Sequence, residues 1–119
     1  MSGIAAYREH GVVTQSRGQL VVMLYEGAIR FLEEAVAAME RKDLAEKGRL
    51  IGKAMDIVAE LDRSLDFGAA EDLCGNLRSL YEFIHRHLFQ ANLKCDTQAV
   101  RDVIKLLEDL NQAWRAISM

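Results

Sequence analysis

The chemistry that this sequence comes closest to supporting is metal binding by Glu82 and His85. The run Glu82-Phe83-Ile84-His85 has the E-x-x-H spacing with which di-iron helical bundles place two ligands on one inward helix face. Such a centre needs the motif twice and one glutamate from each of the other two helices, and the motif occurs once here. Glu82 also points away from the leucine stripe of its own segment. We therefore expect a solvated surface pair and no metal site.

The other reactive side chains do not form a catalytic constellation. His85 and His87 lie on different sides of a helix, which makes a poor zinc pair. Cys74 and Cys95 have no metal or redox spacing, so we expect two small helix residues with free thiols. Hydrolase or transferase chemistry needs a nucleophile, a base and an oxyanion site held together, and no motif supplies them. We predict that the protein is not an enzyme and uses no cofactor; bound iron or zinc in the purified protein would support the opposite reading, a metal-dependent bundle enzyme.

Composition and charge favour a cytoplasmic helical protein of one domain. Half of the 119 residues are hydrophobic and proline is absent, while Leu, Ala, Glu and Arg are abundant, which is a helical composition. The net charge is -3 with both signs interleaved, so no basic stripe is available for nucleic acid. Glu26 and Arg30 interrupt the longest apolar run before it reaches the ~18 residues of a membrane span. The N-terminus lacks the features of a secretory signal, so we expect neither secretion nor membrane insertion.

Four amphipathic segments with short connections predict an all-α fold, an antiparallel up-down-up-down four-helix bundle. The expected helices cover residues 16–41, 44–65, 69–93 and 97–118, with capping residues at Ser16, Asp43 and Asp96. Residues 1–15 are less periodic and are expected to form an N-terminal arm or a short extra helix, so the bundle domain covers residues 16–119. The residues expected to face inward near helix ends include Leu20, Leu44, Leu73, Ala113 and Ile117.

The segment from Leu20 to Met39 is more apolar than a helix with one buried face requires. One broad stripe at helical spacing contains Leu20, Leu24, Gly27, Ala28, Phe31, Leu32, Ala35 and Met39. A second stripe, centred well over ~120° from the first, contains Val22, Ile29 and Val36, with Tyr25 beside it. This surplus apolar surface is either covered from within the chain or offered to a partner.

Several motifs, in their order along the chain, resemble the flagellin export chaperone family (FliS). Met23-Leu24-Tyr25-Glu26-Gly27-Ala28, followed by Phe31-Leu32, is similar to the family motif M-L-Y-[DE]-G-A-x-x-F-[LI]. Other matching pieces, in order, are Tyr7, Val12-Val13-Thr14, Ser16, Ser64-Leu65-Asp66, Asn76-Leu77, Leu80-Tyr81, Ala91-Asn92 and Ala113-Trp114. The chain departs from the family at Arg17, where a proline is usual, and at Phe67-Gly68-Ala69-Ala70, which replaces an acidic-glycine turn. The second departure leaves the start of the third helix open.

The resemblance implies a cytosolic chaperone that holds the disordered C-terminal segment of flagellin. Held in this way, the segment cannot polymerise early and is delivered to the flagellar type III export gate. An amphipathic client helix would lay its apolar face into a groove between bundle helices. The residues expected to bind the partner are Ile4, Tyr7, Val12, Val22, Tyr25, Ile29, Val36, Phe89, Leu93 and Leu106. The alternative is a structural bundle that homodimerises through the second apolar stripe.

Overall fold

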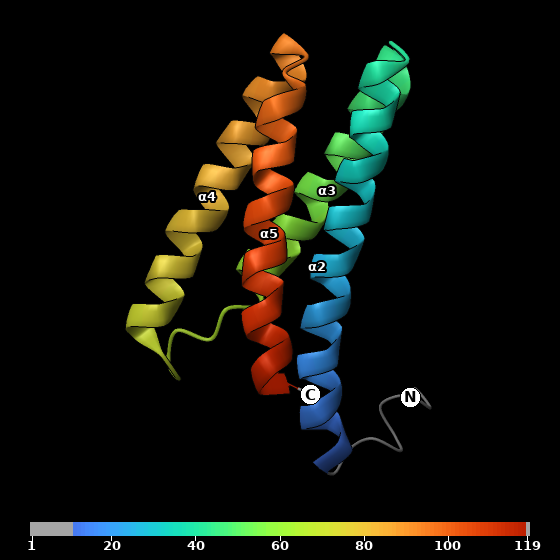
Figure 1. Cartoon of the computed structure of the whole chain (residues 1–119). Coiled ribbons are helices and arrows are strands. Elements are labelled where there is room, and N and C mark those ends of the chain that lie inside the picture. The colour runs from blue at the N-terminus through green and yellow to red at the C-terminus, as the bar shows by residue number, and fades with distance from the viewer. Residues whose placement is uncertain (1–10, 119) are drawn as a thin grey trace.

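The computed structural model describes residues 11–118 and the side chains of residues 17–117. Its four helices are α2 (Gly11–Glu40), α3 (Leu44–Arg63), α4 (Glu71–Lys94) and α5 (Thr97–Ser118), and successive helices run in opposite directions (Figure 1). Both α2 and α4 pack against α3 and α5, so the helices form a ring in which α2 and α4 are diagonal. The predicted four-helix bundle is confirmed.

The starts of α3 and α5 lie where the capping residues predict them. Asp43 accepts a hydrogen bond from the backbone N–H of Glu46 at 3.2 Å, and Asp96 accepts one from the backbone N–H of Ala99 at 3.1 Å. Each bond satisfies an amide that has no partner within its helix. The Glu46 carboxylate accepts hydrogen bonds from Arg49 and not from the backbone N–H of Asp43. The reciprocal pair of hydrogen bonds that defines a capping box is therefore only half formed at this helix start.

The start of the first helix differs from the prediction. α2 begins at Gly11, which places Ser16 inside the helix instead of at its N-cap. Arg17, which stands where the family usually has proline, keeps its backbone N–H, so nothing in the covalent structure ends the helix there. The predicted start at Ser16 is wrong, and residues 11–15, which were assigned to the arm, belong to α2.

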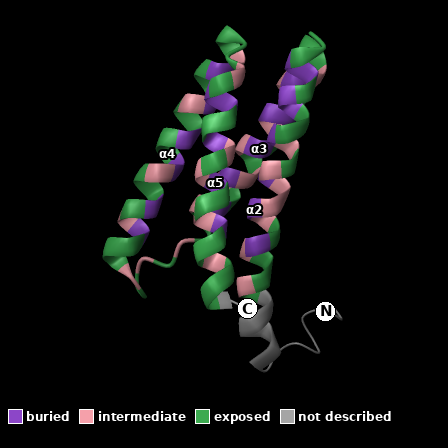
Figure 2. Ribbon diagram, viewed as in Figure 1, coloured by how far each residue is buried: buried purple, intermediate pink, exposed green. Residues whose placement is uncertain are grey.

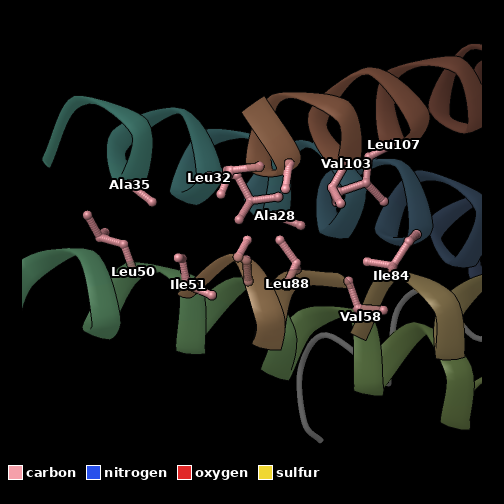
Figure 3. Close-up of a cluster of buried hydrophobic side chains, with 14 of the residues drawn as sticks. Ala28, Leu32, Ala35, Leu50, Ile51, Val58, Ile84, Leu88, Val103 and Leu107 are labelled. Carbon is pink, nitrogen blue, oxygen red and sulfur yellow. The ribbon is translucent and has the colours of Figure 1, made fainter. Parts of the chain in front are cut away.

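The core is built around α2, which is buried on two sides. Ala28, Leu32 and Ala35 of α2 have no solvent exposure. They meet Leu50, Ile51 and Val58 of α3, Ile84 and Leu88 of α4, and Val103 and Leu107 of α5 (Figure 3). Small side chains on α2 allow close approach of its neighbours, and a Cβ atom added to Gly27 would lie 3.4 Å from Cδ1 of Ile57. The small residues therefore serve close helix packing.

Some residues expected to face inward are exposed, and most of them lie near helix ends. They are Leu20, Leu44, Leu73, Ala113 and Ile117. Leu44 and Leu73 lie in the first turns of α3 and α4, and Ile117 lies in the last turn of α5. Glu26, in the fifth turn of α2, pairs with Arg115, three residues before the end of α5, so α5 ends short of Leu20. The apolar spacing along a helix can therefore continue into turns that no neighbouring helix covers.

Candidate functional site

The second apolar stripe of α2 is covered largely by the chain itself. Val22, Tyr25 and Val36 are buried, and Ile29 is half-buried. Buried positions recur along much of the length of α2 (Figure 2). α3 and α5 pack on different sides of α2, so both of its apolar stripes find neighbours within one chain. The expectation that this stripe is exposed is wrong for Val22, Tyr25 and Val36. A dimer through the same stripe would likewise lack an accessible surface.

Tyr25 is the centre of a buried polar contact between three helices. Its hydroxyl lies 2.5 Å from the hydroxyl of Tyr81 on α4, and Trp114 Nε1 of α5 donates a hydrogen bond to it at 3.2 Å. Burial raises the pKa of Tyr25 and of Tyr81, because the phenolate would lose its hydration. Buried tyrosines combine a large apolar ring with a polar tip that needs a partner. Tyr25 therefore contributes to helix registration in the free protein and not to its surface.

The outer surface of α4 carries large apolar side chains. Its buried residues follow one row along the helix and are Cys74, Leu77, Tyr81, Ile84, Leu88 and Ala91. The flanks of this row carry Leu73, Phe83, Phe89 and Leu93, which are 43–66% exposed and which we call the α4 apolar surface. Leu106 of α5 is half-buried and packs against the core. Phe89 and Leu93 are thus exposed, as their position off the inward row predicts.

Two members of the α4 apolar surface were not among the predicted site residues. Phe83 lies within the E-x-x-H run that was considered for metal binding, and its ring stacks on His87 with the ring centres 5.1 Å apart. Leu73 continues the inward spacing of its helix and was therefore assigned to the core. Phe83 could have been found from its place off the inward row, whereas nothing in the spacing distinguishes Leu73 from a core leucine.

The groove between α2 and α5 has a different character, because charged and amide side chains line most of it. It has a volume of about 580 Å³ and contains Ile29, the half-buried member of the second stripe. Arg115 pairs with Glu26 across this groove, and Lys105 pairs with Asp109 along α5 at 2.9 Å. An apolar client helix would remove these groups from water, which costs free energy. This face is therefore a poor site for an apolar segment.

A smaller apolar groove lies at the end of the bundle where α4 diverges from α5 (Figure 1). We call it the end groove; its volume is about 230 Å³, and its lining includes Val21, Leu61, Leu65, Leu77, Tyr81 and Trp114. Cys74 also lines it and is only 5% exposed. The end groove joins side chains from all four helices and from residues 64–70, the connection between α3 and α4.

Glu82, His85 and the two cysteines do not come together in one site. Glu82 and His85 are both exposed on α4, and the described residues contain no group of three or more His, Cys, Asp or Glu side chains placed to hold a metal ion. Cys74 is buried and Cys95 exposed, both as free thiols. No helix in the described part of the chain is both long and apolar enough to cross a membrane.

Three predicted contacts cannot be placed. Ile4 and Tyr7 lie outside the described residues, and Val12 belongs to the first turn of α2, outside the described side chains.

Comparison with known proteins gives consistent matches along the whole chain. The family model described as "Flagellar protein FliS" matches residues 1–119. The chain is 38% identical to the flagellar secretion chaperone FliS of Salmonella typhimurium, over 98% of this chain and 90% of that protein. It is 33% identical to FliS of Bacillus subtilis, over 92% and 81% of the two chains. A solved structure described as a flagellar chaperone from bacteria has a similar fold, with a TM-score of 0.82 at 20% identity over 98% and 94% of the two chains.

Proposed function

Because the chain belongs to the FliS family of flagellar secretion chaperones, we propose that its client is the disordered C-terminal segment of flagellin. In this proposal the chaperone prevents premature polymerisation in the cytoplasm and delivers its client to the flagellar type III export gate. Family membership confirms the resemblance found in the sequence. It also confirms the prediction that the protein is not an enzyme, since the family is one of chaperones.

The observation that carries the proposal is the α4 apolar surface. Phe89 is 52% exposed and Leu93 is 66% exposed, on a helix of 24 residues that is about 36 Å long. Fully burying one such side chain against a client contributes roughly 1.5–3 kcal/mol. A client that becomes ordered on binding loses conformational entropy, so it needs an extended apolar surface of this kind.

The position of α4 supports the same assignment. α4 is diagonal to α2, so the flanks of α4 lie away from the charged groove between α2 and α5. A client helix with apolar residues at spacings of three and four could lie along a flank and contact Phe89 and Leu93. Leu106 of α5, which is half-buried, would extend the contact where the client reaches the neighbouring helix. Ile29 is left as a peripheral contact, because it lies in the charged groove.

The N-terminal residues complete the proposed set of contacts. Ile4, Tyr7 and Val12 are large apolar side chains, and Tyr7 and Val12 belong to the first of the family-like motifs. We propose that they contact the client or the export gate. Removing residues 1–10 tests Ile4 and Tyr7, and Val12→Asp tests Val12. Measuring both interactions for each variant would assign these residues to one partner, to the other or to neither.

The proposal is tested by titrating the purified protein with a labelled C-terminal segment of flagellin. Leu93→Asp should weaken binding by at least about tenfold, because a carboxylate would be desolvated against an apolar helix. Leu20→Asp is the matched control, since Leu20 is another exposed leucine, 54% exposed and on the diagonal helix α2. If both variants lose binding affinity equally, the assignment of the client site to α4 is wrong. If the unmodified protein does not bind the segment, the proposed client is wrong.

Light scattering on the same samples separates the chaperone from a structural dimer. A monomer that changes mass only when flagellin is added supports the proposal. A concentration-independent dimer that ignores flagellin contradicts it.

A further inference from the structure

α4 packs less extensively on its neighbours than α2 does. Its buried residues form a single row with about one member per turn, whereas α2 is packed on two sides. In the first half of α4, Cys74, Leu77 and Tyr81 are buried, Leu80 is half-buried against the core, and Leu73 is 54% exposed. Local opening is favoured where few apolar contacts hold a segment in place.

The two ends of α4 are anchored differently. At its C-terminal end, Lys47 Nζ of α3 donates a hydrogen bond to the Asn92 carbonyl oxygen at 2.8 Å, and only residues 95–96 separate α4 from α5. At its N-terminal end, residues 64–70 form a longer connection from α3, and α4 lies visibly apart from α5 (Figure 1). The N-terminal end is therefore the one that can move.

Arg78 makes the polar contacts of this end that lie near the protein surface. Its Nε donates a hydrogen bond to Oδ1 of Asp62 on α3 at 2.9 Å. Its guanidinium also lies over the ring of Phe67, 4.6 Å from the ring centre, in the connection between α3 and α4. One side chain thus joins α4, the last turn of α3 and the connecting segment. Tyr81 makes the next polar contact along the helix, through the hydroxyl of Tyr25.

We propose that residues 71–81 form a flap over the end groove, hinged in the second half of α4 and held closed by Arg78 and by the hydrogen bond between Tyr81 and Tyr25. When the flap opens, the Leu77 and Tyr81 side chains leave the groove and Cys74 becomes accessible to solvent. If the proposed function holds, this opening offers the groove to apolar client residues that the closed protein cannot accept. The opening itself is a property of the free chain and requires no client.

The two free cysteines supply the test. In a Cys95→Ser variant, Cys74 is the single thiol, and it lies on the buried face of the flap, against the end groove. Its reaction with Ellman's reagent forms a mixed disulfide on Cys74 and releases thionitrobenzoate, which gives the rate. A Cys74→Ser variant gives the rate of the exposed Cys95 for comparison. Urea unfolding of each variant gives the rate expected if only global unfolding exposed Cys74.

If the flap opens, the reaction rate of Cys74 should exceed the rate expected from global unfolding. That reaction rate should also depend less on urea concentration than global unfolding does. The urea dependence follows the surface exposed in the reactive state, and a flap exposes less surface than an unfolded chain. Arg78→Ala should increase the rate by about threefold to tenfold, which corresponds to losing a partly exposed ion pair and a cation–π contact. Arg86→Ala is the control, because Arg86 lies on the same helix and forms no hydrogen bond or ion pair with the described residues.

Three results would overturn the flap. The first is a Cys74 rate and urea dependence equal to those of global unfolding. The second is a Cys74 rate equal to that of Cys95, which would mean that the thiol is not covered. The third is an equal effect of Arg78→Ala and Arg86→Ala. None of these measurements contains flagellin, so a failure of the flap is distinguishable from a failure of client binding.

Discussion

Tyr25→Phe removes one oxygen atom from the middle of the bundle and leaves its shape unchanged. Tyr25 has no solvent exposure, and its hydroxyl is the partner of both Tyr81 and Trp114. After the change, the Tyr81 hydroxyl loses its partner while Tyr81 remains 3% exposed. Trp114 is half-buried, so its indole N–H can recover a water molecule more readily.

The cost follows from this asymmetry. A buried donor or acceptor left without a partner costs about 1–3 kcal/mol, and most of that cost falls on Tyr81. Tyr81→Phe should cost less than Tyr25→Phe, because Tyr25 retains the hydrogen bond from Trp114. In the double variant both hydroxyls are absent, so the loss should be smaller than the sum of the two single losses.

Urea unfolding followed by far-UV circular dichroism measures these free energies of unfolding. If Tyr25→Phe changes stability by less than about 0.5 kcal/mol, the value of an ordinary surface substitution, the three-helix contact does not exist as described. Additive losses in the double variant would also contradict the direct bond between Tyr25 and Tyr81.

Burial of the Tyr25 and Tyr81 hydroxyls makes stability sensitive to alkaline pH. Burial raises the pKa of Tyr25 and Tyr81 above the ordinary value near 10, so above that pH the unfolded chain releases phenolic protons that the folded chain keeps. Their contribution is fully present below about pH 10 and is lost as the pH rises further, by up to about 1.4 kcal/mol per pH unit for each group. The Tyr25→Phe and Tyr81→Phe variants should each show a shallower alkaline decline in urea unfolding experiments. An unchanged decline would contradict the burial of the two hydroxyls.

Three further substitutions test the packing of α2 and the open side of α3. Val36→Asp should destabilise the protein by about 3 kcal/mol or more in urea unfolding, because Val36 is 9% exposed and a carboxylate there would be buried without a partner; unchanged stability would mean that the second stripe of α2 is exposed after all. Gly48→Ala and Gly52→Ala should each raise stability by up to about 1 kcal/mol in the same assay, because a Cβ atom at either position meets nothing within 4 Å and alanine favours the helix; a loss of stability would contradict the open space beside these glycines.

Local sequence determined the parts of the fold that depend on neighbouring residues. Asp43 and Asp96 begin helices because a side-chain oxygen reaches an amide three residues on, whatever the rest of the chain does. The apolar spacing of α4 similarly places Leu77, Tyr81 and Ile84 in the core, as predicted. The family could also be recognised from the sequence, because it depends on residue types in a fixed order and not on their burial.

Only the tertiary structure decided which apolar surface remains open. Helical spacing shows that Val22 and Val36 share a face, but the neighbours α3 and α5 determine that this face is buried. Leu73 and Leu77 continue one regular spacing, yet Leu77 is 7% exposed and Leu73 is 54% exposed, because Leu73 lies in the first turn of α4, where it lines the open end groove. The physical reason is that burial depends on the position of other helices, which the spacing along one helix does not contain.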